Sequence, residues 1–278
     1  RRPATGRRGG GVNLPLFART LAWQRTRWLV VVIAIFGWGV LIPVIYTAFS
    51  DVIRDLANSG AIPEELLSFG SGSLFSLPGS ITIGIQHPLA IAMVAVFAVG
   101  AAATAIAGER QAGTLEVMLA RPVSRVTVYL SIFIGLLLVV AVVLAALIGG
   151  FIVGSAIQGV LDELPLEHVP MLWLNGFLLW GAFATFGLAA SVSFDRPGPA
   201  IGLTLAYLLV NYFFEILGSL WREAAWTQEY SLFHHYQPTE ILEGALDPID
   251  LVILGIAFVV PIIYALVVFP RRDLAAPA

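Results

Sequence analysis

Residues 108–125, GERQAGTLEVMLARPVSR, form a short charged segment between two long apolar runs. A helix needs about 20 apolar residues to cross the hydrocarbon core of a bilayer, and both runs are that long. The polar segment is therefore expected to be held between two membrane spans, where a protein outside the membrane would be able to act on it.

Helix start and stop signals divide this segment. Gly113 suits the position directly after a helix end, so the preceding span is expected to stop there. Thr114 is expected to cap a short helix over residues 115–120, and Pro122 disfavours helix at the residue before it. Ser124 is expected to cap the next span. These breaks predict a short helix set at an angle to the spans.

The apolar side chains of this short helix, Leu115, Met118 and Leu119, share one face, and Glu116 lies beside them. One interpretation is a charged loop whose arginines follow the usual cytoplasmic preference. The other is a coupling helix that docks in a groove on a cytoplasmic ATPase. Ordinary loops between spans are shorter and lack two caps and a stop, but the residues alone leave both interpretations open.

The composition is that of an integral membrane protein. The chain of 278 residues is 58% hydrophobic and 12% charged, about half the charged share of a soluble domain. It has no cysteine, which excludes disulfides, thiolate metal sites and cysteine nucleophiles. All 15 basic residues are arginine, so the chain lacks the lysine of a P-loop and is not a P-loop ATPase by itself.

The expected fold is an all-α integral membrane domain over residues 1–278 with six transmembrane helices. The apolar segments that are long enough to span a bilayer are residues 28–49, 88–107, 126–157, 171–193, 200–220 and 249–269. The third would rise roughly 48 Å and is expected to tilt or to project from the membrane. Residues 50–87 and 221–248 are the two long outer segments.

Charge bias predicts the orientation. With both termini in the cytoplasm, only Arg54 and Arg222 of the 15 arginines fall outside, while most acidic residues do. A multi-pass protein of a bacterial cell membrane is expected. Before the first span, residues 13–27 place Leu14 and Phe17 at helical spacing, which favours an amphipathic helix in the interface plane. A plain extension of the first span is the alternative.

The central segment resembles the cytoplasmic signature of ABC-2-type transporter permeases, which reads roughly GE…GTL-acid-x-LLA-x-PVSR. The matching residues are Gly108, Glu109, Gly113, Thr114, Leu115, Glu116, Leu119, Ala120, Pro122, Val123, Ser124 and Arg125. Met118 stands where relatives often have leucine, and the strings NLPLFARTL and FPRRDL are also similar to this family. Relatives commonly carry a lysine where this chain has Ile132, so an anchoring role of that lysine does not carry over.

This resemblance implies a six-span exporter permease with an interfacial elbow helix at residues 13–27, a coupling segment at residues 108–125 and short outer helices before the sixth span. The expected substrate is a drug, an antibiotic, a lipid, a polysaccharide or another amphipathic molecule. The implied ATPase-coupling residues are Glu109, Gly113, Thr114, Leu115, Glu116, Met118, Leu119, Arg121, Pro122 and Arg125.

The resemblance also implies partners. Two copies of a separate ABC ATP-binding subunit would bind ATP and Mg²⁺, and a second permease subunit would complete a homo- or heterodimer in the lipid bilayer. This chain would then hold no cofactor, would not be an enzyme and would have no nucleic-acid partner.

Four polar residues are candidates for the transport pathway. Asn211 and Glu215 lie in the fifth span, where a carboxylate is costly and usually faces a cavity or a partner. Glu215 lies near the outer end, so an interfacial or packing role is the alternative. His234 and His235 follow in the outer segment, where a polar, aromatic surface near an exit gate is expected.

His234, His235 and Glu240 also admit a different function, either a membrane-embedded enzyme or a secondary transporter. Adjacent histidines point apart in a helix or a strand, which disfavours a metal site. A secondary transporter usually has repeated halves and several ionisable residues at mid-membrane, and the chain shows neither.

The third span carries a GxxxG motif at Gly150 and Gly154. Small residues at this spacing let helix backbones approach closely in a membrane. The motif predicts either packing within the chain or a seam between two subunits.

Overall fold

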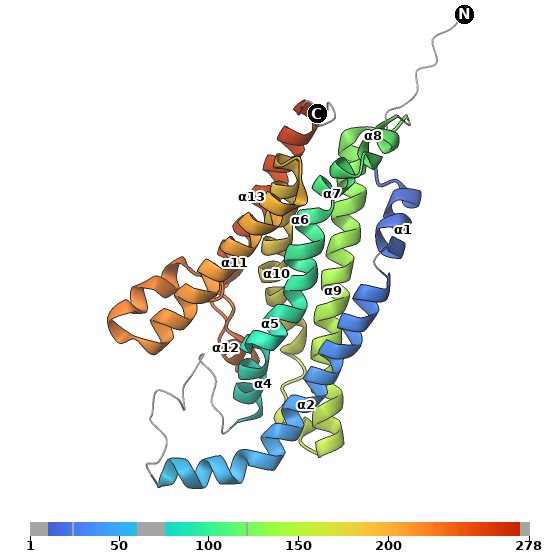
Figure 1. The fold of residues 1–278 in the computed structure, drawn as a ribbon. Coiled ribbons are helices and arrows are strands. Elements are labelled where there is room, and N and C mark those ends of the chain that lie inside the picture. The colour runs from blue at the N-terminus through green and yellow to red at the C-terminus, as the bar shows by residue number, and fades with distance from the viewer. Residues whose placement is uncertain (1–10, 24, 60–75, 121, 273–278) are drawn as a thin grey trace, which may run out of the picture.

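The computed structural model describes residues 11–23, 25–59, 76–120 and 122–272, and all regular secondary structure within them is helical (Figure 1). Five helices are long and apolar enough to cross a membrane. They lie within α2 (Arg25–Asn58), α9 (Arg125–Gln158), α10 (Val169–Ser193), α11 (Pro197–Leu220) and α13 (Pro248–Arg271). A sixth span is obtained if a bent helix pair is counted as one. The all-helical fold with several apolar spans is thus confirmed.

The second helix of the bent pair stands where the second span was expected, and the first helix precedes it. The first part of the pair is α4 (Leu77–Gln86), and its second part, residues 88–104, runs on from α5 (Pro88–Ala95) at an angle of 53°. Pro88 lacks a backbone N–H and pushes the preceding residue away from helical geometry. His87 is accordingly extended, and its Nδ1 accepts a hydrogen bond from the Leu89 N–H at 3.2 Å.

The rest of this span is assembled from short pieces. A π-helix, η2 (Val96–Ala101), is followed by α6 (Ala102–Thr104), a turn and then α7 (Ala107–Gln111). The expected span over residues 88–107 is therefore interrupted near its polar end. It is preceded by a packed helix within the expected outer segment, because Leu77 and Ile81 of α4 are buried.

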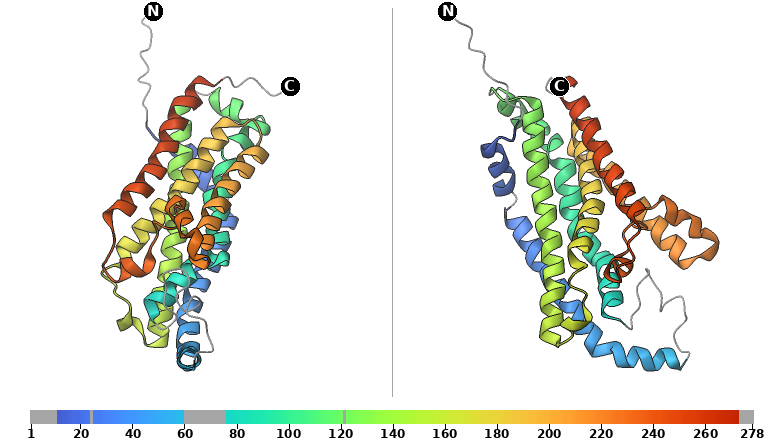
Figure 2. Two further views of the ribbon diagram at one scale, coloured as in Figure 1. Left: turned by 90° about the vertical axis from the view of Figure 1, so that its left-hand side faces the viewer. Right: turned by 180° about the vertical axis from the view of Figure 1, so that it is seen from behind.

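The central helix is α9, which runs the length of the bundle (Figures 1 and 2). Its 34 residues rise roughly 51 Å. Ser124 caps it as expected, since its Oγ accepts a hydrogen bond from the Thr127 N–H at 3.1 Å. The helix ends at Gly159, whose φ of 73° suits a glycine.

Glycines hold α2 against α9. A Cβ on Gly150 would lie 2.3 Å from the carbonyl oxygen of Phe36, and a Cβ on Gly154 would lie 2.6 Å from that of Val40. From the other side, a Cβ on Gly39 would lie 2.4 Å from the carbonyl oxygen of Leu147. The GxxxG motif therefore packs two helices of the same chain, which agrees with the first of its two interpretations.

The two ends of the bundle differ. One end carries α7, α8 (Thr114–Leu119) and the C-terminal end of α13, and we call it the α8 end (Figure 2). The opposite end carries the short helix η3 (Leu161–Glu163). α11 and η4 (Arg222–Tyr230) leave the bundle as a helical hairpin on one side, and α12 (Pro238–Leu242) leads back to α13 (Figure 1).

The helix expected at residues 13–27 is present but shorter, because α1 covers Leu14–Trp23 and α2 begins at Arg25. α1 packs on α9, where the Asn13 N–H donates a hydrogen bond to Ser131 Oγ at 2.9 Å. This helix is therefore attached to the bundle by its own contacts.

Replacing Gly150 by valine should lower the melting temperature of the detergent-purified protein, because the new side chain meets backbone atoms of α2 and forces the helices apart. Overpacking of this kind costs about 1–3 kcal/mol. Gly255→Val is the matched control, since nothing lies within 4 Å of a Cβ at that position. Equal melting temperatures for the two variants would contradict the glycine seam.

Candidate functional site

The centre of the α8 end is the turn at Gly113, which separates α7 from α8. Gly113 has a φ of 70° and is the N-cap of α8, with no side-chain hydrogen bond to the helix. The expectation that Thr114 caps this helix is wrong, because Thr114 is its first residue. Its hydroxyl lies instead 3.1 Å from the Glu109 carbonyl oxygen and close to the Glu109 carboxylate, and a charged acceptor makes the stronger bond.

α8 presents its apolar face inward. Leu115 and Met118 are 1% and 8% exposed and lie in a buried cluster with Tyr129 of α9, while Leu119 packs against the same cluster. These three side chains therefore hold α8 on the bundle and do not form its outer surface.

The outward face of α8 consists of Glu116, Val117 and Ala120. Val117 is 66% exposed. Beside it, a groove of about 300 Å³ separates α8 from α1 and is lined by Asn13, Val117 and their neighbours. Among the described residues of α8, Glu116 is the only charged residue on the outward face.

Glu109 connects three helices. Its side chain in α7 is buried, with the residue 4% exposed. The guanidinium of Arg19 in α1 donates to both carboxylate oxygens at 3.1 and 3.3 Å, and Thr114 of α8 contacts one of them. A buried carboxylate requires such partners, because an uncompensated charge out of water is strongly unfavourable.

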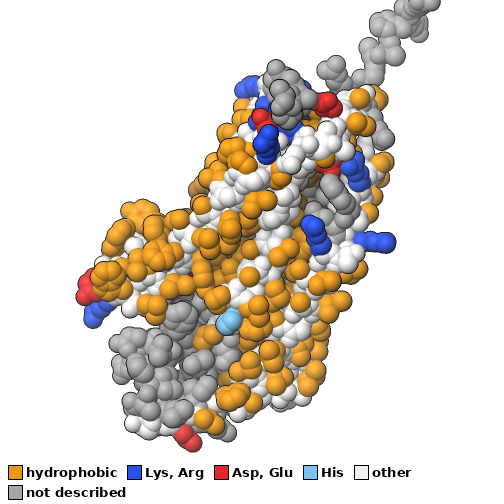
Figure 3. Space-filling model, viewed as in Figure 1, with side chains coloured by type: hydrophobic (Ala, Val, Ile, Leu, Met, Phe, Trp, Pro, Cys, Tyr) orange, Lys and Arg blue, Asp and Glu red, His pale blue; other side chains and the backbone are white. Residues whose placement is uncertain are grey.

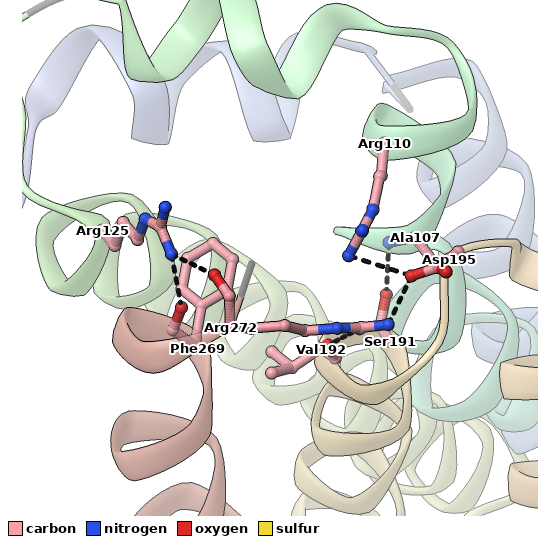
Figure 4. Close-up of polar contacts among 8 residues, drawn as sticks. All are labelled: Ala107, Arg110, Arg125, Ser191, Val192, Asp195, Phe269 and Arg272. Carbon is pink, nitrogen blue, oxygen red and sulfur yellow. Dashed lines mark hydrogen bonds and ion pairs between the residues drawn. The ribbon is translucent and has the colours of Figure 1, made fainter. Parts of the chain in front are cut away.

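The break between α6 and α7 is capped from α10. The N–H groups of Ile106 and Ala107 both donate to Ser191 Oγ at 2.9 Å. Figure 4 shows the bond from Ala107. Ser191 is fully buried. Since unpaired buried N–H groups are costly, this hydroxyl stabilises the break and ties α7 to α10.

Asp195 joins α7 to the end of α13. It follows α10 and forms an ion pair of 2.9 Å with Arg110 and a second with Arg272, which also donates to the Val192 carbonyl (Figure 4). Burial and the charge of Arg110 lower the pKa of Arg272, while Asp195 opposes this shift. One carboxylate therefore balances two guanidinium groups.

Arg125 attaches α9 to α13. Its Nη1 donates to the carbonyl oxygens of Phe269, Pro270 and Arg272 at 3.3, 3.2 and 2.6 Å. Figure 4 shows the bonds to Phe269 and Arg272. A cation at the C-terminal end of a helix satisfies its free carbonyls and its dipole. Arg125 thus has an internal role. Pro122 is exposed, and Arg121 lies outside the described residues.

The two pathway candidates in α11, Asn211 and Glu215, form hydrogen bonds to the segment that follows α11. Asn211 is 4% exposed, and its Oδ1 accepts a hydrogen bond from the Leu232 N–H at 2.8 Å. Glu215 accepts one from Gln228 Nε2 at 3.0 Å. Both side chains therefore hold the segment after α11 in place.

The rings of His234 and His235 lie at a steep angle to each other. Nδ1 of His235 lies 2.7 Å from Asp250 Oδ1, and the ring planes of His234 and His235 are inclined by 70°. Glu240 is exposed on α12. Within the described ranges, no three His, Cys, Asp or Glu residues are grouped so that they would hold a metal ion.

Sequence reasoning missed the partners of this site, namely Arg19, Ser191, Asp195 and Arg272. In the expected topology, Asp195 and Arg272 lie on the same side of the membrane as residues 108–125. The opposite charges of Asp195 and of the arginines expected on the same side are the signal that points to Asp195; nothing in the sequence marks Ser191.

Replacing Glu109 by glutamine should loosen the attachment of α8, because the charge that binds Arg19 and Thr114 is lost. Amide hydrogen exchange of α8 should accelerate on the order of tenfold, the ratio for about 1.4 kcal/mol of local stability. Glu116→Gln makes the same chemical change on the exposed face and should leave exchange unchanged. If both variants exchange like the wild type, Glu109 does not hold α8.

Asp195→Asn should lower the melting temperature, since Arg110 and Arg272 lose their shared counter-charge. The expected loss is about 1 kcal/mol, because Asp195 is half exposed and water screens the pairs. Asp162→Asn, at the opposite end of α9, is the control. A variant as stable as this control would show that the cluster contributes nothing to stability.

A family model for ABC-2 family transporter proteins matches residues 23–274, which include the spans, residues 108–125 and the end of α13. A search of curated proteins finds no match. Five to six apolar helices agree with a multi-pass membrane protein of this kind. Since the match covers nearly the whole chain, the protein belongs to the ABC-2 transporter family, whose members are transport permeases that associate with an ABC ATP-binding subunit.

Proposed function

We propose that this chain is the permease subunit of an ATP-driven exporter in a bacterial cell membrane, with both termini cytoplasmic. Two copies of an ATP-binding subunit would bind ATP and Mg²⁺, and two permease subunits, identical or different, would form the pathway. The substrate would be a drug, an antibiotic, a lipid or another amphipathic molecule. Export is inferred from the likeness of residues 108–125 to the signature of exporter permeases.

The observation that carries this proposal is α8 itself, a short helix with one face anchored and the other exposed. Transmission of force from a partner requires a contact surface and a firm attachment to the spans. Glu116 and Val117 supply the exposed surface, next to the groove along α1. Leu115 and Met118 supply the attachment, because both are buried against the core.

The hydrogen bonds of the α8 end support a route by which α8 would move the spans. Displacement of α8 would act on α7 through Glu109 and Thr114, and on α1 through Arg19. From α7 it would reach α10 through Ser191. The second span is bent at His87 and broken after Thr104, so these are the places where its angle is free to change.

The test is assembly with the ATP-binding subunit. The double variant Glu116→Arg and Val117→Arg should reduce co-purification of that subunit on the order of tenfold or more, as expected when central contacts of an interface are replaced. Glu167→Arg is the control, because it reverses an exposed charge beyond the opposite end of α9. Undiminished co-purification of the double variant would count decisively against this docking surface.

A further inference from the structure

We propose that the second span is a helix with two registers, and that the π-helix η2 holds the one extra residue that separates them. In the register of this structure η2 is π-helical; in the other it is a regular α-helix, and α6 and α7 lie further toward the α8 end. The change would move Glu109, which holds α8. This inference concerns the chain alone and goes beyond the docking of a partner on α8.

The hydrogen bonds of the second span change at η2. The Ala102 N–H donates to the Phe97 carbonyl, which lies five residues back, whereas an α-helix uses the carbonyl four residues back. This turn therefore contains one residue more than an α-helical turn. π-Helical turns are rare and are frequently found at functional sites. Conversion of η2 to an α-helix would advance each following residue by about 1.5 Å and rotate it by about 100°.

Both ends of α6 are irregular, so this piece is separated from the helices on either side. It is only three residues long, Ala102–Thr104, between η2 and the break that Ser191 caps. Thr104 Oγ1 lies 2.9 Å from the Gly100 carbonyl oxygen and 3.2 Å from that of Ala101. Figure 3 shows mainly hydrophobic side chains on the face where the second span lies, and backbone groups in such surroundings need partners within the chain. One hydroxyl that reaches two carbonyls supplies such a partner in either register.

The packed side of α6 consists of alanines, which makes a shift by one residue sterically possible. Ala102 and Ala103 are fully buried, and Ala101 is 8% exposed. Ala102 lies against Gly187 of α10, where a Cβ on the glycine would be 3.0 Å from the Ala102 Cβ. After the shift, Ala101 would take the place of Ala102, and Ala102 that of Ala103. Since these side chains are identical, neither a cavity nor an overlap results at these positions.

The other side of the same pieces borders a cavity. This cavity has a volume of about 570 Å³ and lies between the second span, α1, the start of α2 and α9. The second span contributes residues from η2, α6 and α7 to its wall, among them Phe97, Ala101, Thr104 and Gly108. Rotation and advance of these pieces would therefore displace them along a cavity and not into tightly packed side chains.

An advance of α6 reaches α8 through α7. Glu109 lies in α7, and its carboxylate binds Arg19 of α1 and Thr114 of α8. An advance of about 1.5 Å exceeds what these hydrogen bonds tolerate, because they extend only to about 3.2 Å between heavy atoms. α8 would therefore follow α7 or lose this attachment. In both cases the register of η2 determines how α8 is held.

Deletion of Gly100 tests whether η2 contains a removable residue. Nothing lies within 4 Å of a Cβ at Gly100, so the deletion removes no side-chain contact, and the span becomes a continuous α-helix with α6 in its present place. The variant should melt within about 3 °C of the wild type.

Deletion of Gly37 is the matched control. Nothing lies within 4 Å of a Cβ there either, but Gly37 lies inside the regular helix α2. Its deletion rotates the buried Ile35 by about 100° relative to Gly39 of the glycine seam and should lower the melting temperature by about 10 °C or more. A Gly100 deletion that is as damaging as this control would show that η2 has no residue to lose, which would overturn the proposal.

Disulfide cross-linking in membranes that contain the full chain tests whether both registers occur, since the chain has no cysteine of its own. Gly187→Cys with Ala102→Cys reports the register of this structure, and Gly187→Cys with Ala101→Cys reports the advanced one. Both cross-links should form. Deletion of Gly100 should reduce the Ala101→Cys cross-link on the order of tenfold and preserve the other, because a continuous α-helix has no extra residue with which to advance.

The pair Gly187→Cys with Gly100→Cys gives the background, because two residues of rotation separate Gly100 from Ala102. An Ala101→Cys cross-link that does not exceed this background, or that persists undiminished when Gly100 is deleted, would overturn the proposal. Both experiments use the chain without the ATP-binding subunit. Their failure would therefore leave the proposed docking on α8 standing.

Discussion

The buried carboxylate of Glu109 is the constraint on which the α8 end depends. A charge that is 4% exposed is stable only with partners, and its partners come from two other helices, α1 and α8. Arg19 reaches it across 90 residues of sequence. The position of α8 is therefore tied to that of α1 by an interaction that tolerates little displacement, because any separation leaves a charge in the interior.

The remaining polar contacts follow from the rule that backbone groups within a bilayer must be satisfied inside the protein. At three helix ends or breaks a side chain supplies the missing partner: Ser191 at the α6–α7 break, Arg125 at the end of α13 and Ser124 at the start of α9. Along the membrane-spanning length, the α2–α9 seam needs only glycines such as Gly150. Side-chain hydrogen bonds thus hold the helices together at the α8 end, and close packing of backbones holds α2 against α9 along the membrane-spanning length.

Local signals made much of this architecture predictable. The apolar runs, the turn at Gly113 and the cap at Ser124 depend on neighbouring residues, and they stand where the sequence placed them. Thr114 was misassigned because a glycine with positive φ replaces a side-chain cap, and a buried carboxylate attracts the hydroxyl. Pairings between distant turns, such as Asp195 with Arg272, depend on how the spans pack and have no local signal. The sequence of α8 shows an apolar face at Leu115, Met118 and Leu119, but it does not tell whether that face meets the core of the chain or a partner.

Exposure of one face of α8 to a partner is most directly measured by cross-linking, since the chain contains no cysteine and a single one is easily introduced. A cysteine at Val117, which is 66% exposed, should cross-link to the ATP-binding subunit in the assembled complex. A cysteine at Leu115, which is 1% exposed, should not. Cross-links to lipid alone from Val117, with none to the subunit, would contradict a coupling role for α8.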